Sequence, residues 1–194
     1  MAMKSLPTAR GNPYITIIWL LIIGSGILFL FLIIAYLIRV NNLSGKHIVI
    51  PGYFYLSTVF IFASSLTLHQ ANKCFRKELF KAYFSWIGIT VLAAIAFCIF
   101  QILGWQNLFN QGVNFKNIEG AFIYILSGLH FSHMAFGLTG LALVLRDSFK
   151  NRRYVDGFIV SLNPAKNTLA QIVTIFWHFL GFLWIALFCV FLIH

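Results

Sequence analysis

The chain has 194 residues, of which 60% are hydrophobic and only 9% are charged, with a net charge of +10 at pH 7. That balance excludes an ordinary water-soluble domain and predicts an integral membrane protein. The positive charges are spread over short segments between long apolar stretches, where membrane topology explains them, so they do not predict nucleic-acid binding.

Five stretches of the chain contain no Lys, Arg, Asp or Glu. A helix rises about 1.5 Å per residue and the hydrocarbon core of a bilayer is about 30 Å thick, so each stretch is long enough to cross it. Backbone amides inside lipid need partners in their own segment, which favours helices. We therefore predict an all-α integral membrane protein, a single domain with five transmembrane helices in one bundle. The predicted spans are residues 15–38, 53–71, 82–105, 120–145 and 169–193.

The first stretch is too long for the apolar part of a cleaved signal peptide, and it ends in Ile38-Arg39 rather than at a small-residue cleavage site. We expect it to be a retained helix. The basic residues predict its direction. Eleven of the fourteen Lys and Arg fall on one side of the predicted spans, and the other three are Arg39, Lys46 and Lys116. The positive-inside rule then places the N-terminus in the cytoplasm and the C-terminus outside.

The fourth stretch carries two candidate packing faces. Small side chains at a spacing of 4, 3 and 4 residues form one stripe, which favours close helix packing. This small-residue stripe consists of Gly128, Ser132, Ala135 and Thr139. Two histidines and two glycines lie on the opposite side, namely His130, His133, Gly137 and Gly140. We expect protein on both faces, and hence a central position for this helix.

The fifth stretch contains WHFLGFLW, in which Trp177 and Trp184 are seven residues apart and therefore lie on one face. His178 lies at nearly the same depth as His133. Three hypotheses are open for the histidines: ligands of a haem or metal, a proton or substrate relay, or structural groups that hydrogen-bond between helices or reach a lipid head group. The three cysteines, Cys74, Cys98 and Cys189, are isolated in sequence and predict no disulfide framework.

These two stretches resemble the last two helices of subunit III of haem-copper terminal oxidases. That family has Gly-x-His-x-x-His in the penultimate helix, which Gly128, His130 and His133 match, and Trp-His-Phe followed by a second tryptophan in the last, which Trp177, His178 and Trp184 match. Upstream, Pro51, the Ser57-Thr58 pair and Ser64, His69 in LTLHQA, and Gln101 in FQILG resemble residues of the preceding helices. The resemblance covers the chain from about Pro51 to the C-terminus, and its length suits the five-helix bacterial members.

The resemblance implies an accessory, non-catalytic subunit of a respiratory oxidase in a bacterial plasma membrane. In that family, haem and copper in subunit I reduce oxygen with proton pumping, and either cytochrome c or quinol donates the electrons. Subunit III binds no redox cofactor itself, packs against subunit I within a complex that also holds subunits II and IV, and binds phospholipid in a cleft. The structural or lipid-contacting residues would be His69, His130, His133, Trp177, His178 and Trp184.

The sequence also differs from the family pattern. The family commonly has a buried glutamate near the position of Gly24-Ser25, and an aspartate where this chain has Gly181. A carboxylate role is therefore not carried over. Two alternatives remain open at this point: a stand-alone membrane haem or metal-binding cytochrome with His133 and His178 as ligands, or a small transporter, although no span offers the buried carboxylate that proton relays usually use.

Overall fold

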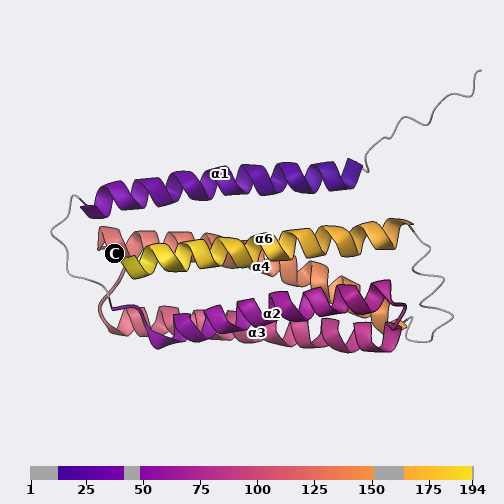
Figure 1. Cartoon of the computed structure of the whole chain (residues 1–194). Coiled ribbons are helices and arrows are strands. Elements are labelled where there is room, and N and C mark those ends of the chain that lie inside the picture. Colours follow the sequence, from indigo (N-terminus) through magenta and orange to yellow (C-terminus); the bar gives the residue numbers. More distant parts are fainter. Residues whose placement is uncertain (1–12, 42–48, 151–163, 194) are drawn as a thin grey trace, which may run out of the picture.

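The computed structural model describes residues 13–41, 49–150 and 164–193, and Figure 1 shows them as a bundle of long helices. The five helices in these residues are α1 (Pro13–Asn41), α2 (Gly52–Arg76), α3 (Phe80–Asn110), α4 (Ile118–Lys150) and α6 (Pro164–Ile193). The prediction of an all-helical chain is confirmed for the described residues. Each helix continues past the uncharged stretch by several residues, because polar residues outside the hydrocarbon can still extend a helix.

Four of the helices in the described residues are long and apolar enough to cross a membrane: Pro13–Arg39, Phe80–Asn110, Ile118–Phe149 and Asn167–Ile193. The exception is α2, whose 25 residues span about 37 Å but include many hydroxyl side chains. Those hydroxyls lie at contacts with other elements of the bundle. Ser57 and Ser64 are fully buried, and Thr67 shares a hydrogen bond of 2.8 Å with Thr90 of α3. The low hydropathy of α2 thus reflects polar groups that face neighbouring helices.

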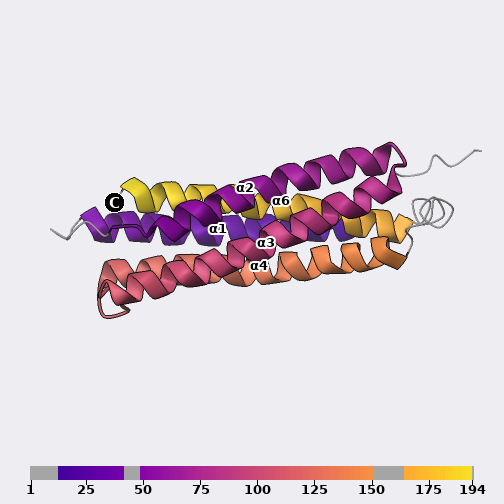
Figure 2. The same cartoon turned by 90° about the horizontal axis from the view of Figure 1, so that it is seen from below.

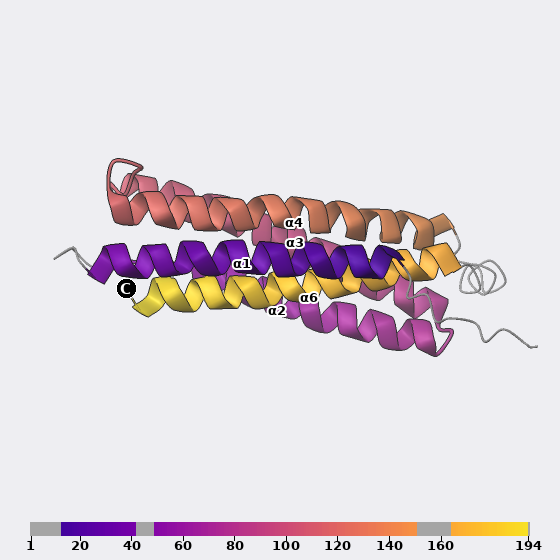
Figure 3. The same ribbon diagram turned by 90° about the horizontal axis from the view of Figure 1, so that it is seen from above.

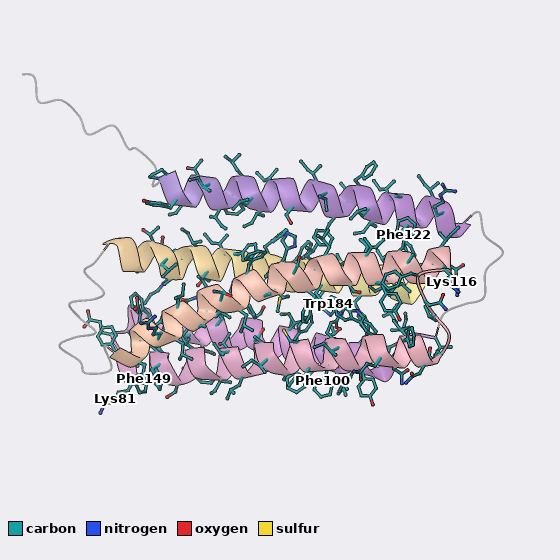
Figure 4. All side chains as sticks on the ribbon, turned by 180° about the vertical axis from the view of Figure 1, so that it is seen from behind. Lys81, Phe100, Lys116, Phe122, Phe149 and Trp184 are labelled. Carbon is teal, nitrogen blue, oxygen red and sulfur yellow. The ribbon has the colours of Figure 1, made fainter. Side chains whose placement is uncertain are left out.

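The helices run alternately in opposite directions, so the ends of successive helices meet at two opposite ends of the bundle (Figures 1 and 3). The end that holds the α2–α3 turn contains Lys73, Arg76, Lys77 and Lys81, and we call it the basic end. Arg39 and Lys116 lie at the opposite end. Figure 4 shows Lys81 and Lys116 at these two ends.

The helices form a close pair, α2 and α3, with α4 and α6 packed beside it and α1 as an outer helix. Helices α2 and α3 lie side by side along their length, α4 packs on α3 and α6, and α6 also contacts α2. Helix α1 lies on the outside over α4 and α6 (Figures 1 and 3). Its other faces carry exposed apolar side chains such as Leu20 and Phe31. A helix that is apolar all round suits a lipid environment.

The turn between α2 and α3 is short and has a defined backbone. Glu78 has a φ of 59°, in the left-handed region that ends many helices. The amide of Leu79 donates to the carbonyl oxygen of Cys74 over 3.0 Å, and the amide of Lys77 donates to that of Lys73 over 3.2 Å. The last carbonyl groups of α2 are therefore satisfied within the turn, which joins α2 and α3 as a tight helical hairpin.

Candidate functional site

The two tryptophans of α6 connect it to α2. Trp177 Nε1–H donates to Ser64 Oγ over 3.1 Å, and Trp184 Nε1–H donates to Thr58 Oγ1 over 3.0 Å. Both rings are fully buried, and Figure 4 shows Trp184 in the interior of the bundle. A buried indole needs a partner for its N–H, and here the hydroxyls of α2 supply it. Because the tryptophans are seven residues apart, they form two hydrogen bonds between the same pair of helices, α6 and α2.

Gly181 lies between these two hydrogen-bonded tryptophans, on the face of α6 that contacts α2. A Cβ added there would lie 3.1 Å from Ser65 Oγ. The position that carries an aspartate in the resembled family is thus used here for close approach of α2. A larger side chain would require the Ser65 hydroxyl to move.

His130 lies inside a cluster of aromatic rings. Its ring centroid is 5.3 Å from that of Trp184 and 6.0 Å from that of Phe97 on α3. The side chain is fully buried, and neither ring nitrogen has a hydrogen-bond partner among the described residues. The side-chain amide of Gln101, also fully buried, is likewise without one there. His130 therefore contributes ring packing where α3, α4 and α6 meet.

His133 instead connects α4 to α1. Its Nδ1 lies 2.8 Å from the carbonyl oxygen of Leu129, and its Nε2 lies 3.1 Å from Ser25 Oγ. Because a carbonyl only accepts, Nδ1 carries the proton of the neutral ring and Nε2 accepts from the Ser25 hydroxyl. Phe29 of α1 packs edge-on to the same ring at 5.6 Å. Both ring nitrogens of His133 thus take part in hydrogen bonds within the bundle.

Ser25 was not among the predicted site residues. It occupies the segment in which the resembled family has its buried glutamate, and it holds the second histidine of the motif through a neutral hydrogen bond. A signal for it existed in the sequence, since a serine in an otherwise apolar span needs a partner in the bundle. Its partner could not be chosen before the position of α1 was known.

His69 and His178 are exposed side chains that line one groove between α2 and α6. The groove has a volume of about 760 Å³ and lies toward the basic end of the bundle. Across it, Asn72 Nδ2–H donates to Thr174 Oγ1 over 3.2 Å. The six predicted site residues thus separate into two groups: four that lie in the interior or between helices, and these two histidines that face a polar groove.

His133 and His178 are not brought to a common site, because His133 faces α1 whereas His178 faces α2 across the groove. The sequence indicated that the two histidines lie at a similar depth in the membrane, but not that their side chains face different helices. Among residues 13–41, 49–150 and 164–193, no three His, Cys, Asp or Glu side chains come together as a metal site would need. The pair of ligands that the stand-alone cytochrome hypothesis names, His133 and His178, is therefore not formed in this arrangement.

The two predicted faces of α4 behave differently. Gly137 and Gly140 pack against α6: a Cβ at Gly137 would lie 2.9 Å from Leu180 Cδ1 and 3.2 Å from the Trp177 ring. The small-residue stripe is not covered by any described helix. Its members Ser132, Ala135 and Thr139 are exposed, and a Cβ at Gly128 would meet nothing within 4 Å. Within the described chain, α3 and α6 approach α4 from other sides, so the expectation that protein covers this face stays a prediction.

Together, the long apolar helices and their inward hydrogen bonds define the class: a multi-pass, all-helical membrane protein. Comparison with known sequences narrows it further. The chain is 32% identical over 139 residues to cytochrome c oxidase subunit 3 of Alkalihalophilus pseudofirmus, a match that covers 70% of this chain and 63% of that protein. It is 27% identical to cytochrome c oxidase subunit 3 of Bacillus sp. strain PS3, over 94% of this chain and 86% of the relative.

A third relative is cytochrome bo(3) ubiquinol oxidase subunit 3 of Pseudomonas aeruginosa, 28% identical over 89% of this chain and 80% of that protein. No protein-family model matches the chain. These relatives, each named as subunit 3 of an oxidase, support the oxidase subunit 3 family for this chain.

Proposed function

We propose that the chain is an accessory, non-catalytic subunit of a respiratory haem-copper terminal oxidase. The observation that carries this proposal is that Trp177, Trp184 and His133 form hydrogen bonds with other helices of the same bundle. These side chains therefore have a structural role, as expected for a non-catalytic subunit. Relatives named as subunit 3 of cytochrome c and ubiquinol oxidases support the same role. Oxygen is then reduced at haem and copper held by partner subunits, with cytochrome c or quinol as the electron donor.

We further propose that all five helices cross a bacterial plasma membrane, with the N-terminus in the cytoplasm. For α2, the support is that the hydroxyls of Thr58, Ser64 and Thr67 bond α3 and α6 rather than facing lipid. The gathering of basic residues at one end supports the direction, because that end faces the cytoplasm under the positive-inside rule. In this orientation the groove of His69 and His178 opens toward the cytoplasmic side.

Two contacts of the subunit complete the proposal. The exposed small-residue stripe of α4 is the face offered to catalytic subunit I, with subunits II and IV in the same complex, because small side chains allow another helix to approach closely in lipid. Phospholipid occupies a cleft between the helices, and the groove between α2 and α6 is the cleft that the geometry favours. The chain itself holds neither haem nor copper.

The test is purification in mild detergent through a tag on the N-terminus, with reduced-minus-oxidised spectra of the complex and of the stripped chain. We expect haem and copper in the complex and none on the stripped chain. His133→Leu and His178→Leu should weaken assembly or turnover stability while the haem spectrum of whatever complex remains is unchanged, since neither imidazole ligates haem. Haem that stays with the stripped chain, and disappears in the two variants, would contradict the proposal and support a cytochrome.

A further inference from the structure

Two polar side chains in the interior of the bundle make no hydrogen bond to the rest of the described chain. They are Gln101 of α3 and His130 of α4, and both are fully buried. Neither end of the Gln101 amide and neither ring nitrogen of His130 has a partner among the described residues, so the two side chains do not bond each other directly. Burying an amide or an imidazole without a partner is costly, and such groups are normally hydrogen-bonded.

The register of α3 against α4 brings these two side chains to the same level. At one contact between the helices, Trp105 Nε1–H donates to Ser127 Oγ over 3.0 Å. At a second contact, the ring centroids of Phe97 and His130 lie 6.0 Å apart. Gln101 is four residues from both Phe97 and Trp105, on the same face of α3. It therefore lies between the two contacts, opposite the segment of α4 that ends at His130.

Aromatic rings pack around this pair. The ring centroid of Trp184, which Figure 4 shows in the interior of the bundle, lies 5.3 Å from that of His130. Phe54 of α2 stacks on Trp184 at 6.0 Å. The same Phe54 ring approaches α3 beside Gln101, because a Cβ added at Gly104 would lie 2.8 Å from it. These rings supply packing contacts to the two polar groups rather than hydrogen bonds.

The chemistry of the two side chains defines the ligand that fits between them. A neutral imidazole has one donor and one acceptor, and a glutamine amide has both kinds of group as well. A shared ligand must therefore be able to donate and accept. The surrounding stretches 82–105 and 120–145 contain no charged residue, so an ion would have no counter-charge there, which is costly. Water is small and neutral, and it bridges buried polar groups in this way.

We propose that a water molecule is bound between the Gln101 amide and the His130 imidazole and joins α3 to α4. The water bonds one ring nitrogen and the side-chain amide, and the tautomer of the ring decides which group donates. The site lies about 18 Å along α4 from its first residue, Ile118. It goes beyond the proposed function, because it concerns a contact within the chain that depends on no partner subunit.

The first measurement uses the full chain in the assembly in which it purifies. X-ray radiolysis converts water to hydroxyl radicals, which oxidise the side chains beside each water molecule, and mass spectrometry measures the oxidation of each tryptophan. Trp184 and Trp177 are equally buried, so bulk water reaches neither ring. Trp177 bonds Ser64 directly and is the internal control. We expect several-fold more oxidation of Trp184, which packs on His130, than of Trp177.

Variants then identify the groups that hold the water. Gln101→Met combined with His130→Phe should lower the oxidation of Trp184 to the level of Trp177. Thr90→Val is the matched control, because it removes another buried polar group of α3, a hydroxyl that bonds α2 directly. This control should leave the oxidation of Trp184 unchanged.

Unfolding in mixed micelles of mild detergent and SDS measures whether the two groups share one ligand. Gln101→Met alone should shift the equilibrium about 5- to 30-fold toward the unfolded state, because the water loses a partner and His130 is left unsatisfied. Adding His130→Phe removes the remaining polar group, so the double variant should recover part of this loss.

Equal oxidation of Trp184 and Trp177 in the native chain would overturn the proposal, as would oxidation of Trp184 that persists in the double variant. Single variants that are as stable as the native chain, or more stable, would also overturn it, because groups without a partner gain from apolar replacement. Destabilisation by Gln101→Met without oxidation of Trp184 would mean a direct bond between Gln101 and His130, and would likewise contradict a bridging water.

Discussion

At the scale of single residues, the contact between Ser25 and His133 is one of those that hold α1 on the bundle. Helix α1 is apolar, and most of its surface faces outward. Packing alone gives α1 little preference for a position against another apolar helix over a position in lipid, because both surroundings offer similar dispersion contacts. A hydrogen bond at one height along the helix fixes both its rotation and its vertical position.

Replacing Ser25 with alanine should therefore destabilise the α1–α4 contact by about 1 kcal/mol, since it removes the bond and leaves His133 Nε2 without its donor. Unfolding of the purified protein in mixed micelles of mild detergent and SDS measures the change. Ser85→Ala is the control, because the exposed Ser85 hydroxyl donates to the carbonyl oxygen of Lys81 within its own helix. Equal stability of Ser25→Ala and Ser85→Ala would show that the contact does not hold α1.

Residue spacing predicted much of the site but not the direction of each side chain. The tryptophans seven apart do lie on one face and make equivalent bonds to α2. The two histidines three residues apart contact different parts of the bundle. His130 packs in the cluster of aromatic rings, and His133 hydrogen-bonds to helix α1. Spacing along one helix fixes relative angles, but which helix occupies each angle depends on the packing of the whole bundle.

At the scale of elements, the two faces of α4 provide a direct comparison of glycines. Gly137→Val places a branched side chain against Leu180 and Trp177, where a Cβ alone already comes within 2.9 Å of Leu180 Cδ1. We expect a loss of about 1–3 kcal/mol of stability from overpacking, measured by the same unfolding experiment.

Gly128→Val places the same side chain in open space on the small-residue stripe, so the isolated chain should unfold at the same detergent composition as the native chain. If the stripe contacts catalytic subunit I, this variant should instead lower the yield of assembled complex. Similar destabilisation of the isolated chain by both substitutions would contradict the assignment of the two faces.

The helices were predictable because absence of charge over 19 to 26 residues allows few alternatives in lipid. Their ends were less predictable, since α4 continues from Gly120 back to Ile118 and forward to Lys150 through charged residues. The partner of the small-residue stripe on α4 was not predictable for a related reason: a set of small residues shows that a close approach is allowed, but not which helix makes it.

At the scale of the whole molecule, the alternating helix directions can be tested through sidedness. Lys81 and Lys116 lie at opposite ends of the bundle (Figure 4). In a cysteine-free background, Lys116→Cys should react with a membrane-impermeant maleimide added outside intact cells. Lys81→Cys should react only after the cells are opened. Labelling of both positions from the same side would mean that α3 does not cross the membrane.

Figure 2 shows the bundle from below, with α2 and α3 together and diverging from α6 toward the basic end. The groove between α2 and α6 lies toward this end. The sequence contained the polar residues of the groove, but the groove itself depends on an angle between helices that no local pattern specifies.

The short turn at Glu78 has a consequence for how the protein enters the membrane. Taken alone, α2 is a weak segment for the insertion machinery, because its hydroxyls and His69 reduce its apolar character and their partners on α6 are synthesised about a hundred residues later. Helix α3 follows after three residues and is strongly apolar. If α2 crosses the membrane as proposed above, partition into lipid favours the two helices as one unit, and α2 then depends on α3 for its integration during synthesis.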